Sequence, residues 1–231
     1  MLDSEPPTSL SPVPLRGPLN RASVVACALS VIDRDGIEGL SMRGLARIAG
    51  CDPMALYRHI PNRAALLDAV AEAVLSTVAE VDPADPDWNF ELRVLARSYR
   101  NAALAHPKVV VLMVTRPQST PLGLHSRSTL AVLGSVLALL TENGFAPADA
   151  LTVYRNLFSF LRGHVLIEQQ ESRDHPEDTE DLVRLALRSL NGPGHSILKS
   201  LTSNLSTFDG DAVFERGLDS LLAGAVVGRD S

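Results

Sequence analysis

Residues 40–70 read "LSMRGLARIAGCDPMALYRHIPNRAALLDAV", a stretch with the start and stop signals of two short consecutive helices. Ser41 is a suitable N-cap for the first helix, and Gly50 is a suitable stop. Asp52 is a suitable N-cap for the second helix and Pro53 fits its first position, and Pro61 must end the helix. The stretch therefore predicts two short helices joined by a tight turn with a glycine, the arrangement of a helix-turn-helix.

Longer helices are expected on both sides of this pair. Asn20 is a candidate N-cap for a helix that Gly36 ends, with an apolar stripe from Val24 to Ile32. Asn62 is placed to cap a helix through Val78, which the run "DPADPD" (82–87) closes. Residues 20–81 are thus predicted to form three short helices and one long helix.

Two interpretations of the second short helix compete. Cys51 and His59 could form a small reactive centre, but they are eight residues apart and no Asn or Asp is placed to orient the imidazole. Alternatively, the helix presents a surface. A helix of about seven residues is unstable alone and must be held by its neighbours, which fixes its outer face in place. The pattern favours a recognition helix over a catalytic centre, with Cys51 packed in the turn.

The charge of the chain is unevenly distributed. The net charge is −6, but residues 16–63 hold seven Arg against four acidic residues, whereas residues 64–231 carry a net of −7. A modestly basic N-terminal segment on an acidic body is compatible with an acidic partner such as DNA. It is equally compatible with a chance fluctuation of a few charges, so charge alone does not decide.

The composition indicates an all-α protein without a cofactor. Hydrophobic residues make up 45% of the chain and aromatic residues 4%, so Ala, Leu and Val must form most of the core. The six His are scattered and no glycine-rich phosphate loop is present, so no metal or cofactor is expected. Two Cys, no apolar run of membrane length and no signal peptide predict a cytoplasmic protein without a membrane partner.

Beyond residue 87 the pattern is helical throughout. Helices are expected over about 87–104, 108–115, 122–142, 148–170, 179–190, 194–205 and 211–227, with an exposed acidic loop at 171–181. The first 18 residues contain five Pro and are expected to form a disordered arm.

The sequence resembles the TetR family of bacterial transcriptional repressors. Residues 40–70 match its frame L-[ST]-x-R-x-L-A-x-x-x-G-x-x-x-x-x-L-Y-x-H-x-x-N-[KR]-x-A-L-L-D. The likeness to the tetracycline-repressor-like branch continues in "HPKVVVLMVTRP" (106–117), "ENGFAPADAL" (142–151), "GHVLIEQQE" (163–171) and "FERGLDSLLAG" (214–224). It covers most of the chain except the arm and residues 172–192.

The resemblance implies a disordered arm (1–18), a helix-turn-helix DNA-binding domain (19–66) and a helical ligand-binding and dimerisation domain (67–231). Such a protein is a homodimer that binds a palindromic DNA operator and is released by a small-molecule effector. Carried over position by position, the operator contacts fall on Met42, Arg43, Pro53, Met54, Ala55, Tyr57, His59 and Arg63.

The resemblance also implies a dimer formed as a four-helix bundle by residues 148–168 and 211–227 of two subunits. The expected interface residues are Leu151, Phe158, Phe214, Leu218, Leu221 and Leu222. The apolar stripe of the last helix could instead cover the core of its own chain, an alternative that the sequence leaves open.

The resemblance does not extend to the positions that bind the effector. Drug- and metal-coordinating positions of the tetracycline repressor are occupied here by apolar residues, namely Ala79, Leu95, Leu112 and Ile167, and only the aromatic Tyr99 persists. A magnesium-chelated drug needs oxygen and imidazole ligands. We therefore expect an apolar or amphipathic effector in a pocket edged by Tyr99, Leu112, Met113, Arg116, Phe158 and His164, although His164 could equally be a core histidine.

The sequence thus predicts a ligand-responsive DNA-binding regulator, most simply a repressor, rather than an enzyme. Two rivals stay open. One is a helical enzyme that uses the apolar cavity, and the other is a small-molecule-binding protein whose N-terminal domain does not bind DNA.

Overall fold

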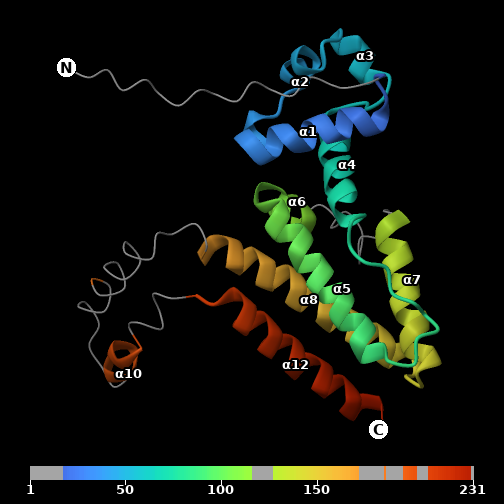
Figure 1. The fold of residues 1–231 in the computed structure, drawn as a ribbon, viewed down its shortest axis with the longest axis vertical. Coiled ribbons are helices and arrows are strands. Elements are labelled where there is room, and N and C mark those ends of the chain that lie inside the picture. The colour runs from blue at the N-terminus through green and yellow to red at the C-terminus, as the bar shows by residue number, and fades with distance from the viewer. Residues whose placement is uncertain (1–17, 116–126, 172–184, 186–194, 202–207, 230–231) are drawn as a thin grey trace.

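The computed structural model describes residues 18–115, 127–171, 185, 195–201 and 208–229. Within these ranges the chain forms helices and no strands, which confirms the all-α prediction. A small N-terminal head stands on a larger helical body, and helix α4 joins the two (Figure 1). The expected arm, the acidic loop and the helix at 179–190 lie outside the described residues, except for Pro18, Glu171 and Leu185.

The head consists of α1 (Arg21–Asp35), the 3-10 turn η1 (Ile37–Gly39), α2 (Met42–Ala49) and α3 (Pro53–Tyr57). The expected caps are present. The side chains of Asn20, Ser41 and Asp52 accept hydrogen bonds from the backbone N–H groups of Ser23, Gly44 and Met54, respectively. Gly50 ends α2 at a φ of 66°, a left-handed conformation that a glycine adopts without strain. The head therefore folds as the local signals predict.

Helix α4 (Arg63–Leu75) packs against α1 in the head and against α5 and α6 in the body. It ends three residues before the predicted limit at Val78. The hydroxyls of Ser76 and Thr77 donate to the backbone carbonyls of Ala73 and Val74, which satisfies acceptors at the helix end. Val78 leaves the helix but stays buried, so its apolar character marked the core rather than a further helical turn.

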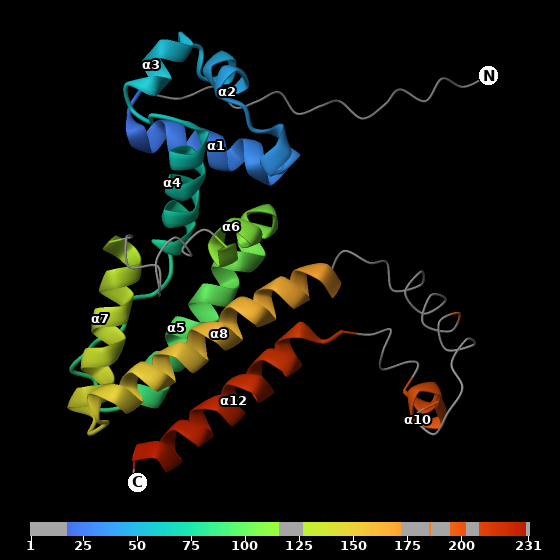
Figure 2. The ribbon, with the colours of Figure 1, turned by 180° about the vertical axis from the view of Figure 1, so that it is seen from behind.

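The body is built around α8 (Pro147–Glu171), a long helix that contacts α5 (Trp88–Ala105), α6 (Val110–Thr115), α7 (Arg127–Glu142) and α12 (Gly210–Arg229). The turn η2 (Pro107–Val109) joins α5 to α6, and the short α10 (His195–Ser200) precedes α12. Figure 2 shows α8 and α12 side by side along one flank of the body.

Ion pairs fasten α12 to the rest of the body. Arg93 pairs with Asp219 at 2.6 Å and Arg97 with Glu215 at 2.8 Å, both from α5 to α12. Arg100 lies between α8 and α12, where its guanidinium binds Glu168 and also contacts Asp211 at 2.5 Å. Three successive Arg on one face of α5 thus set the position of α12.

Candidate nucleic-acid interface and small-molecule pocket

The outer face of the head presents side chains of α2 and α3. Met54 is 68% exposed and Tyr57 42% exposed, and Arg43 on α2 is also exposed. Pro53, Ala55 and His59 are half-buried at the edges of the same face. Leu56 and Ile60 are fully buried and hold this short helix against the head, so its outward side chains are presented from a fixed support.

Two of the expected DNA contacts have other partners. Met42 is only 9% exposed and packs in the core of the head. Arg63 donates from Nε to the carbonyl of Leu40 (3.0 Å) and from Nη2 to the carbonyl of Ile37 (2.7 Å). Both side chains therefore support the exposed face from within the head, a role that the motif match did not indicate.

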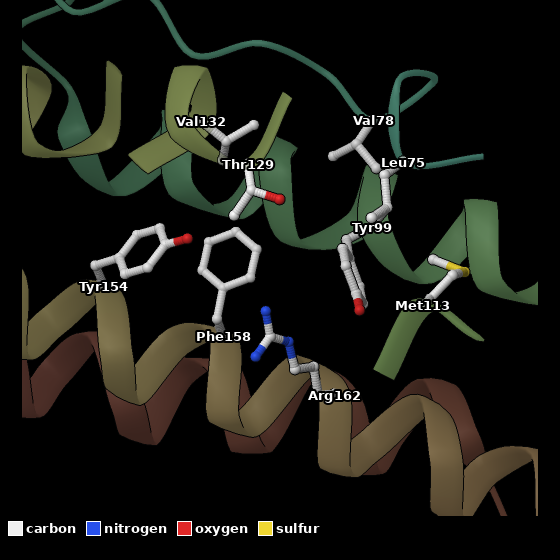
Figure 3. Close-up of a pocket in the computed structure, with 9 residues that line it drawn as sticks. All are labelled: Leu75, Val78, Tyr99, Met113, Thr129, Val132, Tyr154, Phe158 and Arg162. Carbon is white, nitrogen blue, oxygen red and sulfur yellow. The ribbon is translucent and has the colours of Figure 1, made fainter. Parts of the chain in front are cut away.

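A pocket opens in the body between α4, α5, α6, α7 and α8 (Figure 3). Its lining is mostly apolar and aromatic, and consists of Leu75, Val78, Tyr99, Met113, Thr129, Val132, Tyr154, Phe158 and Arg162. The cavity volume is about 40 Å³, enough for only a few water molecules, and the cavity is partly open to solvent. A larger molecule can enter only if lining side chains move.

The structure brings together three of the six expected ligand-binding residues, since Tyr99, Met113 and Phe158 all line the pocket. Leu112 is buried outside the lining, and Arg116 lies outside the described residues. His164 contacts α12 instead. Its ring centroid is 5.1 Å from that of Phe214, and its Nε2 is 3.4 Å from a Glu168 oxygen without hydrogen-bond geometry.

The placement of His164 corrects its expected role. It is 7% exposed, and burial holds its pKa below the ordinary value despite the opposing attraction of Glu168. The side chain is therefore a core histidine between α8 and α12, the alternative that the sequence left open.

The polar groups of the pocket are few and close together. Tyr99 is 2% exposed, and its hydroxyl has no hydrogen-bond partner among the described residues. Burial raises the pKa of Tyr99 to about 12, although the nearby Arg162 guanidinium acts in the opposite direction. Figure 3 shows the Arg162 side chain directed into the pocket between Phe158 and Tyr99.

Sequence reasoning missed six of the nine lining residues, and two of the six, Tyr154 and Arg162, lie on α8. They flank Phe158 at intervals of four residues, so all three project from one face of α8. That spacing was a usable signal, but the nearly uniform apolar pattern of the helix concealed which face lines a cavity.

Comparisons with known proteins agree with this architecture. The family described as "Tetracyclin repressor-like, C-terminal domain" matches residues 82–227. The class D tetracycline repressor of Escherichia coli is 34% identical over 209 residues, which cover 89% of this chain and 88% of the relative. The chain belongs to the tetracycline-repressor family.

A solved member of this family gives the same shape. The Streptomyces coelicolor protein ActR, crystallised in complex with actinorhodin, superposes with a TM-score of 0.77 at 27% identity, over 92% of this chain and 98% of ActR. The tetracycline-repressor fold, the helix-turn-helix head and the named relatives together make this chain a ligand-responsive DNA-binding repressor.

The apolar stripe of α12 was predicted to face a second subunit of a tetracycline-repressor dimer, but it faces α8 of its own subunit. Phe214, Leu218 and Leu222 are at most 1% exposed within the single chain, where α12 packs on α8. Phe158 lines the pocket. Phe214, Leu218 and Leu222 therefore cover the core of their own subunit, which removes their apolar area from water. Leu151, Phe158 and Leu221 of the expected interface remain partly accessible.

The head and body of this tetracycline-repressor chain touch at a second place besides α4. His106 Nδ1 lies 2.9 Å from Asp33 Oδ2 in α1, and Lys108 Nζ donates to the carbonyl of Arg34 at 2.5 Å. On its other side, η2 is bound by Gln169 of α8, which donates to the carbonyl of Pro107. The turn therefore links α1 directly to the helix that forms one wall of the pocket.

None of the described helices is both long and apolar enough to cross a bilayer. Likewise, in the part of the chain that the structure describes, no three His, Cys, Asp or Glu gather in a way that could hold a metal ion. Of the four apolar residues at the expected drug- and metal-coordinating positions, Leu95 and Leu112 are buried in the core.

Proposed function

We propose that the protein acts in the cytoplasm as a homodimeric repressor that binds a palindromic operator and is released by a small apolar or amphipathic molecule. The observation that carries the DNA-binding half is the exposed face of α3. Met54 and Tyr57 project from a five-residue helix that is capped at Asp52 and anchored by buried Leu56. No packing within the described chain accounts for these two exposed side chains, whereas a base edge in a major groove would cover them.

The roles of the face follow from its chemistry. Arg43 can donate to guanine or to a phosphate, and the Tyr57 hydroxyl and the His59 ring can donate to the DNA backbone. Met54 and Ala55 offer apolar contact to thymine methyl groups, with Pro53 beside them at the helix start. Met42 and Arg63 act indirectly, because they hold α2 and α4 in register beneath this face.

The dimer surface is proposed on the outward flank of α8 and α12. A groove with about 430 Å³ of room runs between them, lined by Phe145, Asp149, Thr152, Val153, Asn156, Ser220, Leu221, Gly224 and Ala225. Its small side chains would allow close approach of a second copy of the same pair of helices, as an isologous interface requires. On α12, the apolar side chains of Val213 and Val226 are 41% and 40% exposed.

The effector would act through the elements that the pocket shares with the head. Leu75 of α4 and Met113 of α6 line the pocket, and α4 also packs on α1. Since so little free space exists, a ligand must displace lining side chains and thereby push on α4 or α6. A shift of either element changes the position of the head, so ligand and operator weaken each other's binding reciprocally.

The test of this function is a titration of the full chain against a labelled duplex from the region upstream of its own gene, at several salt concentrations. We expect saturable binding whose affinity falls steeply as salt rises, because phosphate contacts release counterions. Salt-independent binding would contradict contacts to DNA phosphates, and absence of binding would favour a small-molecule-binding protein that does not recognise this DNA.

A further inference from the structure

The most informative unexplained group in the body is Arg162. Among the described residues, Arg93, Arg97 and Arg100 of α5 each pair with a carboxylate, but no carboxylate pairs with Arg162. The segment that joins α6 to α7, residues 116–126, contains no Asp or Glu. A half-buried guanidinium that is directed into an aromatic pocket, and that pairs with no carboxylate of the described residues, indicates that the charge is used by something that enters the pocket.

A second group, next to Arg162, also points to a polar ligand. The Tyr99 hydroxyl is buried and has no hydrogen-bond partner in the described structure. An unsatisfied buried hydroxyl destabilises a folded protein, so its persistence beside Arg162 is explained if a ligand oxygen accepts its hydrogen bond. With a pKa of about 12 the phenol keeps its proton at neutral pH and can donate.

The remaining lining defines the shape of the ligand. Tyr99 and Phe158 are edge-to-face with centroids 6.0 Å apart, and Tyr154 and Phe158 are tilted at 4.5 Å. Leu75, Val132 and Met113 complete walls that offer no further charge. Flat aromatic faces next to branched aliphatic side chains favour a planar ring over a flexible chain.

We propose that the effector is a planar aromatic acid. Its ring lies against Phe158 and Tyr154, its anionic oxygen pairs with Arg162, and a second oxygen accepts from the Tyr99 hydroxyl. This inference rests on the proposed function, since it assigns the effector to this pocket, and it narrows the apolar or amphipathic class to anions.

The experiment compares two fluorescent probes of nearly the same aromatic shape on the full chain. 1-Anilinonaphthalene-8-sulfonate carries an anionic group, and N-phenyl-1-naphthylamine is its uncharged counterpart. We expect the wild type to bind the anion about ten-fold or more tightly than the neutral probe, because a charge-assisted hydrogen bond adds an affinity of that order. The neutral probe should displace the anion, which shows that both occupy one site.

Three variants decide the assignment. Arg162→Met should weaken the anion about ten-fold or more and leave the neutral probe within about two-fold, whereas Arg162→Lys should retain most of the anion's affinity. Arg47→Met removes one exposed charge from α2, far from the pocket, and should change neither probe. This control separates the pairing from an effect of net charge.

The inference is overturned if Arg162→Met leaves the anion's affinity unchanged, or if it weakens both probes equally. If the wild type binds the neutral probe but not the anion, the pocket is a ligand-binding site, but the proposal that its ligand is an acid is wrong. If the wild type binds neither probe saturably, the effector pocket of the proposed function itself fails, and the inference fails with it.

Discussion

Arg63 illustrates how one residue can match a motif and yet have a different main task. Its guanidinium donates to two backbone carbonyls, those of Ile37 and Leu40, which precede the first helix of the recognition pair. The bonds fasten the start of α4 to the chain segment that leads into α2. We infer that Arg63 stabilises the head and that its effect on DNA is indirect.

Replacing Arg63 by Ala should therefore lower the free energy of unfolding by about 1–3 kcal/mol, the usual loss when a charged donor leaves part-buried acceptors unpaired. Urea titration followed by circular dichroism measures it. Arg47→Ala, at an exposed position on α2, should stay within about 0.5 kcal/mol of the wild type. Unchanged stability with lost DNA binding would instead make Arg63 a direct phosphate contact.

The pocket residues differ in how far the sequence alone could predict their roles. Tyr99, Met113 and Phe158 could be placed at the pocket from the resemblance to the family, and all three line it. His164 was ambiguous, since a polar residue on an apolar helix can serve a core or a ligand equally well. Arg162 was not found, because its importance depends on the absence of a nearby carboxylate in the described structure.

At the scale of elements, the contact between α8 and α12 depends on a glycine. A Cβ at Gly217 would lie 2.5 Å from a ring carbon of Phe160, closer than folded proteins allow. Phe160 in turn stacks on Phe214 at 5.8 Å and lies 5.7 Å from the His164 ring. The ring therefore has little freedom to move aside.

Gly217→Ala should destabilise the protein by about 1–3 kcal/mol, the cost of overpacking a well-packed contact. Gly134→Ala on α7 is the matched control, because nothing lies within 4 Å of its Cβ position. That change should stabilise the protein by about 0.5–1 kcal/mol through helix propensity alone. Thermal unfolding compares the two, and equal effects would refute the close contact.

The same pair of helices should respond to acid. Burial lowers the pKa of His164 in the folded chain, so the unfolded chain binds a proton at a higher pH than the folded chain does. Arg100 opposes protonation as well, whereas Glu168 favours it. The free energy of unfolding should therefore fall as the pH drops below the ordinary histidine pKa of 6.5.

Urea titrations of the wild type and of His164→Asn between pH 7.5 and about pH 5.5 test this slope. The variant lacks the titrating group, so its stability should decline less over that range. The difference between the two slopes is the diagnostic quantity, because it removes the contribution of the other titrating groups. An unchanged slope would contradict the lowered pKa.

Helix starts and stops were largely predictable because they depend on local chemistry, such as the caps at Asn20, Ser41 and Asp52. The direction of a helix face was not, since it depends on what packs beside it. The stripe of Phe214, Leu218 and Leu222 fits equally a dimer interface or a core, and only the position of α8 showed that their own subunit buries them.

At the scale of the whole molecule, the proposed dimer surface is the groove between α8 and α12. Ser220 is exposed there, and its hydroxyl donates only to the carbonyl of Arg216 in its own helix. Ser220→Arg should place a charge in the interface and shift the protein from dimer to monomer. Thr141→Arg, at an exposed position on α7, is the control and should leave the dimer intact.

Light scattering after size-exclusion chromatography measures both variants. The monomeric form should also lose operator affinity, because a single head contacts only one half-site of a palindrome. A dimeric Ser220→Arg protein of wild-type affinity would exclude this flank as the interface and require another surface for dimerisation.

DNA binding by the exposed face of α3 is tested by comparing the operator affinities of single-residue variants. The affinities of the wild type, Tyr57→Ala, Arg43→Ala and Arg34→Ala are compared on the same labelled duplex from upstream of the gene. Arg34 is the control because it pairs with Asp35 at the end of α1 next to the body. We predict that Tyr57→Ala and Arg43→Ala each lose at least ten-fold in affinity, while Arg34→Ala and the helix content of all variants stay unchanged. Equal affinity of all four proteins for the duplex would contradict DNA binding by this face.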